Sequence, residues 1–322
     1  MKTDYLYSAA RVKALETSLL SDVQLERLLS AKTHREAFRT LHDTFLSSFI
    51  GDYEKTNLSE SLRESLVEAK KTLDEISPVR GALDIFWMRY DFHNAKTIIK
   101  ARAAGLSPEE AVARCFNLGT VSPADMYDAI DSDRAGSISP ALGKAVARAR
   151  EAKEPQKMDA AMNVGYFAAA ADIAAAAGDE FRRRLVVLLI DLFNLRSLLR
   201  FFASGERIPE VFAPGGTFSR DAFRGADDVF SGMEKIAPRG FWDAAISHYK
   251  ETGFFSMIEL AADDLVLRFL KEESRDIFCL ASLFAYFAAR KNNVQVVKAI
   301  MVAKKNGLSE RDTRKVLRRL YA

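Results

Sequence analysis

The fold is decided by a stretch that the chain contains twice, first as DFHNAKTIIK over residues 91–100 and again as DLFNLRSLLR over residues 191–200. The polar residues that coincide at this single offset of 100 residues are Asp91 with Asp191, Asn94 with Asn194, and Lys96 with Arg196. Self-similarity at a fixed period is typical of proteins that are assembled from copies of one supersecondary unit. The sequence therefore predicts a repeated architecture.

A third copy follows at an offset of 202 residues from the first. It keeps the lysine, as Lys298, and the glycine that follows the stretch, as Gly307. Asn293 stands in place of the aspartate, and Val296 stands in place of the asparagine. The three copies are expected to share a shape without sharing all their contacts.

Shorter matches indicate where each repeat begins. A short helix with a bulky residue four positions on is predicted to follow Ser21, Ser122 and Ser219. The last two serines are preceded by similar tripeptides, Gly119-Thr120-Val121 and Gly216-Thr217-Phe218. We place three helical repeats, each ending in a long helix, at residues 1–106, 107–206 and 207–322. Three equal repeats without an evident polar cap form either an open solenoid or a closed ring or funnel.

The rest of the chain also predicts helices. Nearly every long segment is apolar at helical spacing, and no run alternates β-branched with polar residues. Serine followed by proline, which suits an N-cap and a first helical turn, occurs at 77/78, 107/108, 122/123 and 139/140. Glycines suited to helix ends lie at 105, 178, 205 and 307, and a glycine- and proline-rich loop covers 204–218. We predict an all-α protein.

The repeated stretch lies on a helix predicted over residues 80–103. Trp87, Asp91, Asn94 and Ile98 follow i, i+4, i+7 and i+11 spacing and therefore share one stripe. An acid and an amide in an apolar stripe have two interpretations. They satisfy buried groups of a neighbouring element, because an unpaired buried polar group costs about 1 to 3 kcal/mol, or they line a cavity or a partner surface.

Composition and charge argue against several classes of protein. A formal net charge of +3 over 322 residues does not call for nucleic acid or an anionic membrane surface as partner. Cys115 and Cys279 lack metal-ligand spacing and are expected to be buried, reduced thiols of a cytosolic protein. The N-terminus lacks the pattern of a secretory signal. The apolar run Leu185–Ile190 is flanked by charges and is shorter than the roughly 20 residues of a membrane span, so none is expected.

No catalytic motif is found. The chain has neither a Gly-x-x-x-x-Gly-Lys-Ser/Thr phosphate loop nor a Gly-x-Gly-x-x-Gly turn, and its histidines have no metal-ligand spacing. The acid pairs at 227–228 and 263–264 lack the third acid of a magnesium–diphosphate motif and are interpreted as solvated helix faces. We predict no catalytic residue, no cofactor and no metal.

Basic residues gather in two places. Residues 290–322 contain ten Lys or Arg and two acids, which indicates either a solvated helical hairpin or a surface for an acidic protein or membrane headgroups. Three arginines near the start of the second repeated helix oppose the helix dipole and suggest a partner. The candidates for partner binding are Asp91, Asn94, Lys96, Asp191, Asn194, Arg196, Lys298, Arg182, Arg183, Arg184, Arg314 and Arg318.

Motifs along the whole chain resemble a known family. They are Tyr5-x-Tyr7-x-x-Ala10-Arg11, Leu19-Leu20, Leu28-Leu29 and Tyr90-Asp91-Phe92-His93-Asn94-x-Lys96. This set resembles the C subunits of bacterial and archaeal V/A-type ATP synthases, the counterparts of the d subunits in eukaryotic vacuolar ATPases. Two departures from that family are Phe45-Leu46 after Asp43-Thr44, where a tyrosine is common, and Asn293-x-x-Val296-x-Lys298, where Glu-x-x-Asn-x-Arg is usual.

The resemblance implies a pseudo-three-fold funnel that connects the membrane proteolipid ring to the central shaft subunits of D and F type. It implies a non-catalytic role in coupling rotation to ion transport, at the cytoplasmic face of the membrane and attached to it only through the complex. The alternative, which rests on the repeat alone, is a helical-repeat adaptor that binds a protein partner in an unrelated pathway.

Overall fold

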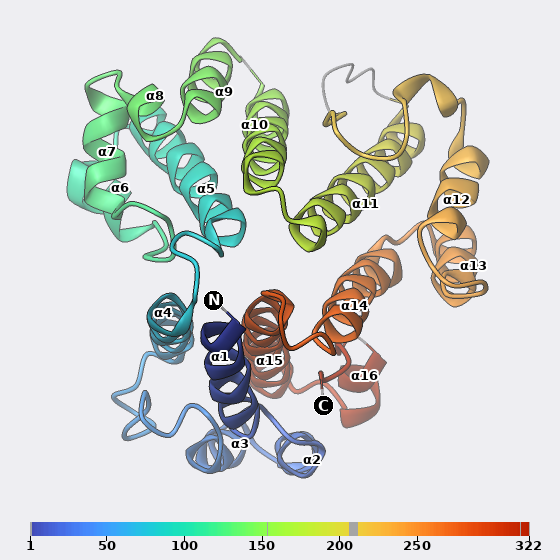
Figure 1. Ribbon diagram of the computed structural model, residues 1–322. Coiled ribbons are helices and arrows are strands. Elements are labelled where there is room, and N and C mark those ends of the chain that lie inside the picture. The colour runs from blue at the N-terminus through green and yellow to red at the C-terminus, as the bar shows by residue number, and fades with distance from the viewer. Residues whose placement is uncertain (1, 153, 206–211, 316, 322) are drawn as a thin grey trace. The chain divides into compact units, whose positions relative to one another are not determined.

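The computed structural model describes residues 2–152, 154–205, 212–315 and 317–321, and every regular element within them is a helix (Figure 1). The prediction of an all-α protein is confirmed. Internal contacts divide the chain into two compact units, which are residues 1–82 with 254–322 (unit 1) and residues 83–253 (unit 2).

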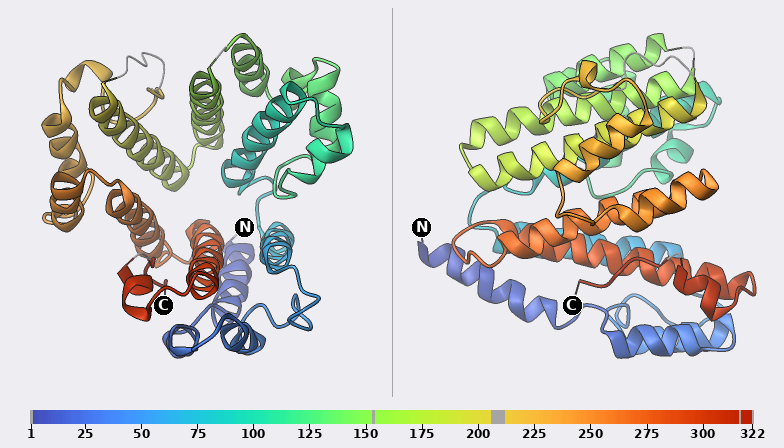
Figure 2. Two further views of the ribbon diagram at one scale, coloured as in Figure 1. Left: turned by 180° about the vertical axis from the view of Figure 1, so that it is seen from behind. Right: turned by 90° about the vertical axis from the view of Figure 1, so that its right-hand side faces the viewer.

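Unit 1 joins the two ends of the sequence. Its helices are α1 (Lys2–Glu16), α2 (Asp22–Ser30), α3 (His34–Thr40), the 3₁₀ turn η1 (Leu41–Asp43), α4 (Leu58–Ile76), α14 (Ser256–Glu273), α15 (Ala281–Lys305) and α16 (Glu310–Lys315). The long helix α15 forms the core, packs against α1, α3, α4 and α14, and lies beside α1 in both views of Figure 2. The long helix of the third copy therefore completes the fold of the N-terminal segment.

Unit 2 is one continuous segment. Its helices are α5 (Asp84–Ala103), α6 (Pro108–Ala113), α7 (Pro123–Asp131), α8 (Ala135–Ile138), α9 (Pro140–Glu151), α10 (Pro155–Ala177), α11 (Glu180–Ser204), the 3₁₀ turn η2 (Arg220–Ala222), α12 (Ala226–Lys235) and α13 (Asp243–Thr252). Helix α10 packs against α5, α9 and α11, and the Tyr166 hydroxyl donates a 3.0 Å hydrogen bond to the Ile85 carbonyl of α5. The three copies of the repeated stretch lie on α5, α11 and α15.

Most predicted helix boundaries agree with the structure. Ser107, Ser122 and Ser139 are N-caps followed by proline, as predicted, and Ser107 with Glu110 also forms a capping box. The predicted exit glycines at 105, 178, 205 and 307 all have positive φ between 60° and 74°, a conformation that glycine adopts without a steric penalty.

Two predicted features differ from the structure, and a third lies partly outside the described residues. Ser77 ends α4 and does not begin a helix, because the chain turns through Gly81, at φ 69°, before α5 starts at Asp84. Ser219 precedes only the 3₁₀ turn η2 and makes no capping hydrogen bond. In the predicted loop 204–218, residues 206–211 lie outside the described part of the chain. The predicted repeat boundaries at 106 and 206 describe the sequence repeat and stay a prediction.

One helix in the described part of the chain, α10, is long and apolar enough to cross a membrane by length and composition. The sequence interpretation missed this alanine-rich run. The core helix of a soluble protein passes the same test, and α10 packs against three other helices of unit 2. The run is therefore weak evidence for a membrane span.

Candidate functional site

Asp91 on α5 binds the loop that precedes α7. Its carboxylate is 1% exposed and accepts hydrogen bonds from the Thr120 hydroxyl at 2.6 Å and from the Thr120 backbone N–H at 3.0 Å. A Cβ atom on Gly119 would lie 2.1 Å from Asp91 Oδ1. The loop can approach the carboxylate because residue 119 has no side chain.

Asn94, one turn further along α5, pairs with the backbone of the same loop. Its Nδ2 donates to the Phe116 carbonyl at 2.8 Å, and its Oδ1 accepts from the Phe116 N–H at 2.8 Å. The fully buried amide thus satisfies both polar backbone groups of one loop residue. We call this pair of contacts, from Asp91 and Asn94 to the following loop, the Asp/Asn clasp.

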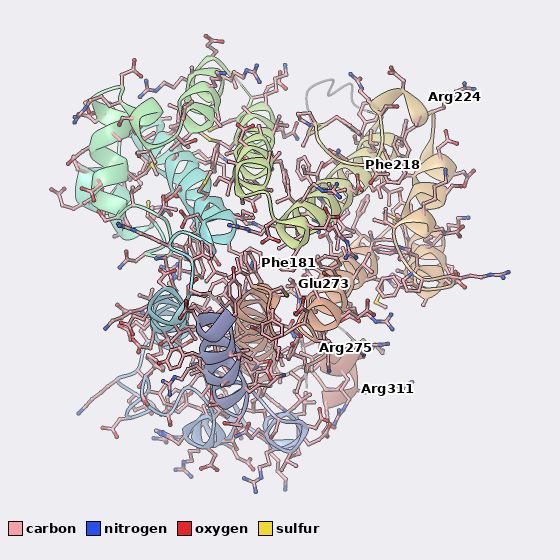
Figure 3. The ribbon with its side chains drawn as sticks, viewed as in Figure 1. Phe181, Phe218, Arg224, Glu273, Arg275 and Arg311 are labelled. Carbon is pink, nitrogen blue, oxygen red and sulfur yellow. The ribbon has the colours of Figure 1, made fainter. Side chains whose placement is uncertain are left out.

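The second copy of the stretch builds the same clasp on α11. Asp191 Oδ1 accepts from the Thr217 N–H at 2.7 Å, and Asn194 makes two 2.8 Å hydrogen bonds with the backbone of Ala213. A Cβ on Gly216 would lie 2.3 Å from Asp191 Oδ1. Phe218, labelled in Figure 3, continues this loop toward α12. The two Gly-Thr tripeptides are therefore the partners of the two aspartates.

Burial shapes the electrostatics of both clasps. Desolvation raises the pKa of Asp91 and of Asp191, while the hydrogen bonds from Thr120 and Thr217 oppose that rise. No lysine or arginine is among the causes of either shift. The hydrogen bonds from each loop, and not an ion pair, compensate the buried carboxylate.

The third copy makes a reduced contact within unit 1. With the Asn293 amide assigned in the orientation that satisfies its neighbours, its oxygen accepts from the Leu20 N–H at 2.6 Å and its nitrogen donates to the Ala289 carbonyl at 3.3 Å. Val296, at the position of Asn94, is 1% exposed. Leu20 precedes Ser21 as Val121 precedes Ser122, so α15 binds the N-terminal segment at the equivalent point.

The structure places the candidate residues of the stripe in the interior. Asp91, Asn94, Asp191 and Asn194 are each at most 1% exposed and bind the backbone of their own unit. This geometry is the first of the two interpretations of the stripe. A part for these residues in partner binding stays a prediction.

Most of the basic candidates have acidic or carbonyl neighbours. Lys96 and Lys100 both reach Asp159 of α10, at 3.5 and 2.7 Å, so this pair ties α5 to α10. Arg196 Nε donates to the Leu192 carbonyl at 3.0 Å within α11. Lys298 is exposed on α15.

The three arginines of α11 differ from one another. Arg182 is 8% exposed and pairs with Asp179 at 2.9 Å, which explains how a cation is tolerated at this helix start. Arg183 pairs with Glu180 at 2.5 Å, and both Arg183 and Arg184 are exposed.

Acids elsewhere in unit 1 partly compensate the basic region at 290–322. Arg314 pairs with Glu26 at 2.5 Å and with Glu310 at 2.6 Å. Arg318 pairs with Asp263 at 2.6 Å, and Arg319 lies 3.6 Å from Asp264. The sequence patterns gave no sign of these pairings, because most of the partners are far apart in the chain.

A further buried residue was not among the candidates from the sequence. Arg290 of α15 is 6% exposed, its guanidinium carbon lies 3.9 Å above the centroid of the Phe45 ring, and its Nε and Nη1 have no hydrogen-bond partner among the described residues. Burial lowers the pKa of this arginine. The equivalent positions in the other two copies are apolar, Met88 and Leu188. An arginine at this position was therefore the signal in the sequence that could have identified the residue.

The two cysteines differ in exposure, and neither is in a disulfide. Cys115 is buried, and burial raises its pKa to about 11, whereas Cys279 is only half-buried, contrary to expectation. Because the thiolate is the reactive form, we predict that iodoacetamide at about pH 8 alkylates Cys279 well before Cys115 in the native protein. Peptide mass spectrometry over time measures both rates. Equal rates after unfolding are the control, and faster native labelling of Cys115 would contradict the prediction.

Fold and site together define an all-helical scaffold in which internal copies of one helix each bind a loop or segment elsewhere in the sequence. Among the described residues, no group of three or more His, Cys, Asp or Glu could hold a metal ion. The chain belongs to the ATP synthase (C/AC39) subunit family, whose profile matches residues 8–316. The resemblance found in the sequence is confirmed.

Individual relatives agree with this assignment. The C subunit of the A-type ATP synthase of Pyrococcus horikoshii is 25% identical, over 92% of this chain and 86% of its own length. Its counterpart in Methanocaldococcus jannaschii is 23% identical, over 97% of this chain and 86% of its own. The C subunit of the V-type ATP synthase of Thermus thermophilus is 22% identical, over 68% of this chain and 69% of its own.

Proposed function

We propose that this protein is the non-catalytic connector in the central stalk of a rotary A/V-type ATP synthase or ATPase. It would join the rotating shaft subunits to the membrane proteolipid ring and so couple rotation to ion transport. The observation that carries the proposal is the family match over residues 8–316, together with relatives named as C subunits of such synthases. The protein would lie at the cytoplasmic face of the membrane, held there by the complex.

The repeated contacts support a closed, pseudo-three-fold funnel. Helix α5 binds the loop before α7, α11 binds the loop before η2, and α15 binds the segment before α2. The third contact therefore links the last copy of the repeated helix back to the first segment of the chain. A closed ring requires such a contact, and an open solenoid does not. Closure would leave no repeat end exposed.

Co-purification tests the proposal. The tagged full-length protein, isolated from its own membranes in a mild detergent, is expected to carry the proteolipid and shaft subunits, identified by mass spectrometry. Removing the protein should leave ATP hydrolysis in the catalytic part while ion transport stops. If the protein carries neither the ring nor the shaft and instead recovers an unrelated protein, the adaptor alternative replaces the connector.

Charge reversal at exposed candidate positions refines the test. Arg183→Glu with Arg184→Glu, and separately Lys298→Glu, are expected to reduce recovery of one neighbour if these residues meet it. Arg148→Glu on the exposed face of α9 is the matched control. Wild-type recovery with both variants would exclude these residues from the contacts without affecting the connector assignment.

A further inference from the structure

Helix α14 has a smaller fraction of buried residues than α15, the long helix of unit 1 against which it packs. Only four of its 18 residues are buried, compared with 17 of 25 in α15. Its main helix partner in the unit is α15. A helix with so few buried residues has a lower free energy of local unfolding than the rest of its unit, unless other contacts stabilise it.

Residues 317–321, which follow α16 without regular structure, cross from α15 to α14. Asn292 of α15 donates a 2.6 Å hydrogen bond to the carbonyl of Arg319, and Lys271 of α14 donates a 2.8 Å hydrogen bond to the carbonyl of Tyr321. Side chains of two helices therefore bind the backbone of one short segment. Figure 3 labels Glu273, the last residue of α14, and Arg275 just beyond it.

Charge reinforces the attachment. Arg318 Nη2 lies 2.6 Å from Asp263 Oδ2, and Arg319 Nε lies 3.6 Å from Asp264 Oδ2. These aspartates form the acid pair of α14 that was interpreted from sequence as a solvated face. Because Asp263, Arg318 and Arg319 are substantially exposed, salt should weaken this part of the attachment.

Tyr321 is the apolar anchor. It is 9% exposed, and the Lys271 ammonium lies 5.3 Å from the centroid of its ring. Burial raises the pKa of its phenol, with smaller opposing effects from the charges of Glu16 and Lys13 of α1. The anchor therefore contacts Lys271 of α14.

We propose that residues 317–321 are a releasable strap that fastens α14 to α15. The buried Tyr321 contributes most of the stability of this attachment. Arg318 and Arg319 make the attachment sensitive to salt. Release loosens α14, the helix through which the chain re-enters unit 1 after unit 2 ends at Gly253. The strap is a conformational device of the fold and does not depend on the connector function.

Hydrogen–deuterium exchange of the full-length protein tests the strap. Tyr321→Ala is expected to accelerate exchange of peptides from residues 256–273 by roughly tenfold while α4 and α5 stay unchanged. Tyr7→Ala, at a 59% exposed tyrosine of α1, is the matched control and should leave α14 unchanged. Unchanged α14 exchange in Tyr321→Ala, or equal acceleration in α4, would overturn the proposal.

Charge reversal provides the second test. Arg318→Glu with Arg319→Glu should accelerate exchange in α14 less than Tyr321→Ala does, and adding Asp263→Arg with Asp264→Arg should restore the wild-type rate. Raising the salt concentration should accelerate exchange in wild-type α14 but not in the Arg318→Glu, Arg319→Glu variant. A salt-independent wild type, or no rescue by the reversed pair, would contradict the ionic part of the strap.

Discussion

Gly119→Ala and Gly216→Ala are each expected to destabilise the protein by about 2 to 4 kcal/mol, from overpacking and from loss of buried hydrogen bonds. The added methyl would lie 2.1 Å from Asp91 Oδ1 in the first case and 2.3 Å from Asp191 Oδ1 in the second. The carboxylate cannot move aside freely, because it is buried and bonded to the next residue of the loop. Chemical denaturation followed by circular dichroism measures the loss.

Gly136→Ala is the matched control for these two substitutions. Gly136 lies on α8 in the same unit, is exposed, and has no described heavy atom within 4 Å of an added Cβ. Alanine there should leave stability unchanged or raise it by about 0.5 kcal/mol, since it restricts the unfolded chain. If all three variants have the same stability, the close approach of loop to carboxylate does not contribute to the fold as argued.

Asn194→Ala is expected to lower the free energy of unfolding by about 2 to 4 kcal/mol, and Asn94→Ala is expected to lower it by distinctly less. Each substitution removes the partner of one backbone N–H and one carbonyl, and each group left unpaired in the interior costs about 1 to 3 kcal/mol. Ala213, the partner of Asn194, is fully buried, whereas Phe116, the partner of Asn94, is only half-buried, so water can replace the lost bonds there. Denaturant titration of both variants gives the order, and the reverse order would contradict this account.

The third copy provides a reciprocal test of the clasp. Val296→Asn restores the consensus of the first two copies in the sequence, but Val296 is 1% exposed among apolar residues of α15. An amide placed there should destabilise the protein by about 1 to 3 kcal/mol, because it is buried without a prepared partner. A stabilising effect would mean that the backbone of a third loop can pair with an asparagine at position 296, as Phe116 pairs with Asn94 and Ala213 pairs with Asn194.

The sequence identified the helix residues and the loop residues of each Asp/Asn clasp, but it did not predict that they bind one another. The Asp and Asn positions and the Gly-Thr tripeptides were both recognised as repeated features, yet nothing local indicates that they bind one another. Thr120 lies 29 residues from Asp91, and Thr217 lies 26 residues from Asp191. The stripe position left both a buried role and a partner surface open, and only the tertiary structure supplied the buried partners.

The repeat itself, the all-α class and the ends of most helices were determined by the sequence alone. Helical periodicity, N-cap serines and exit glycines act within a few residues, and the fixed offset between Asp91 and Asp191 needs no structure to be seen. The tertiary structure decided that α15 completes the N-terminal segment, that Arg318 pairs with Asp263, and that each aspartate binds a glycine-threonine loop. These contacts join groups that are distant in the chain, and packing, not local preference, selects them.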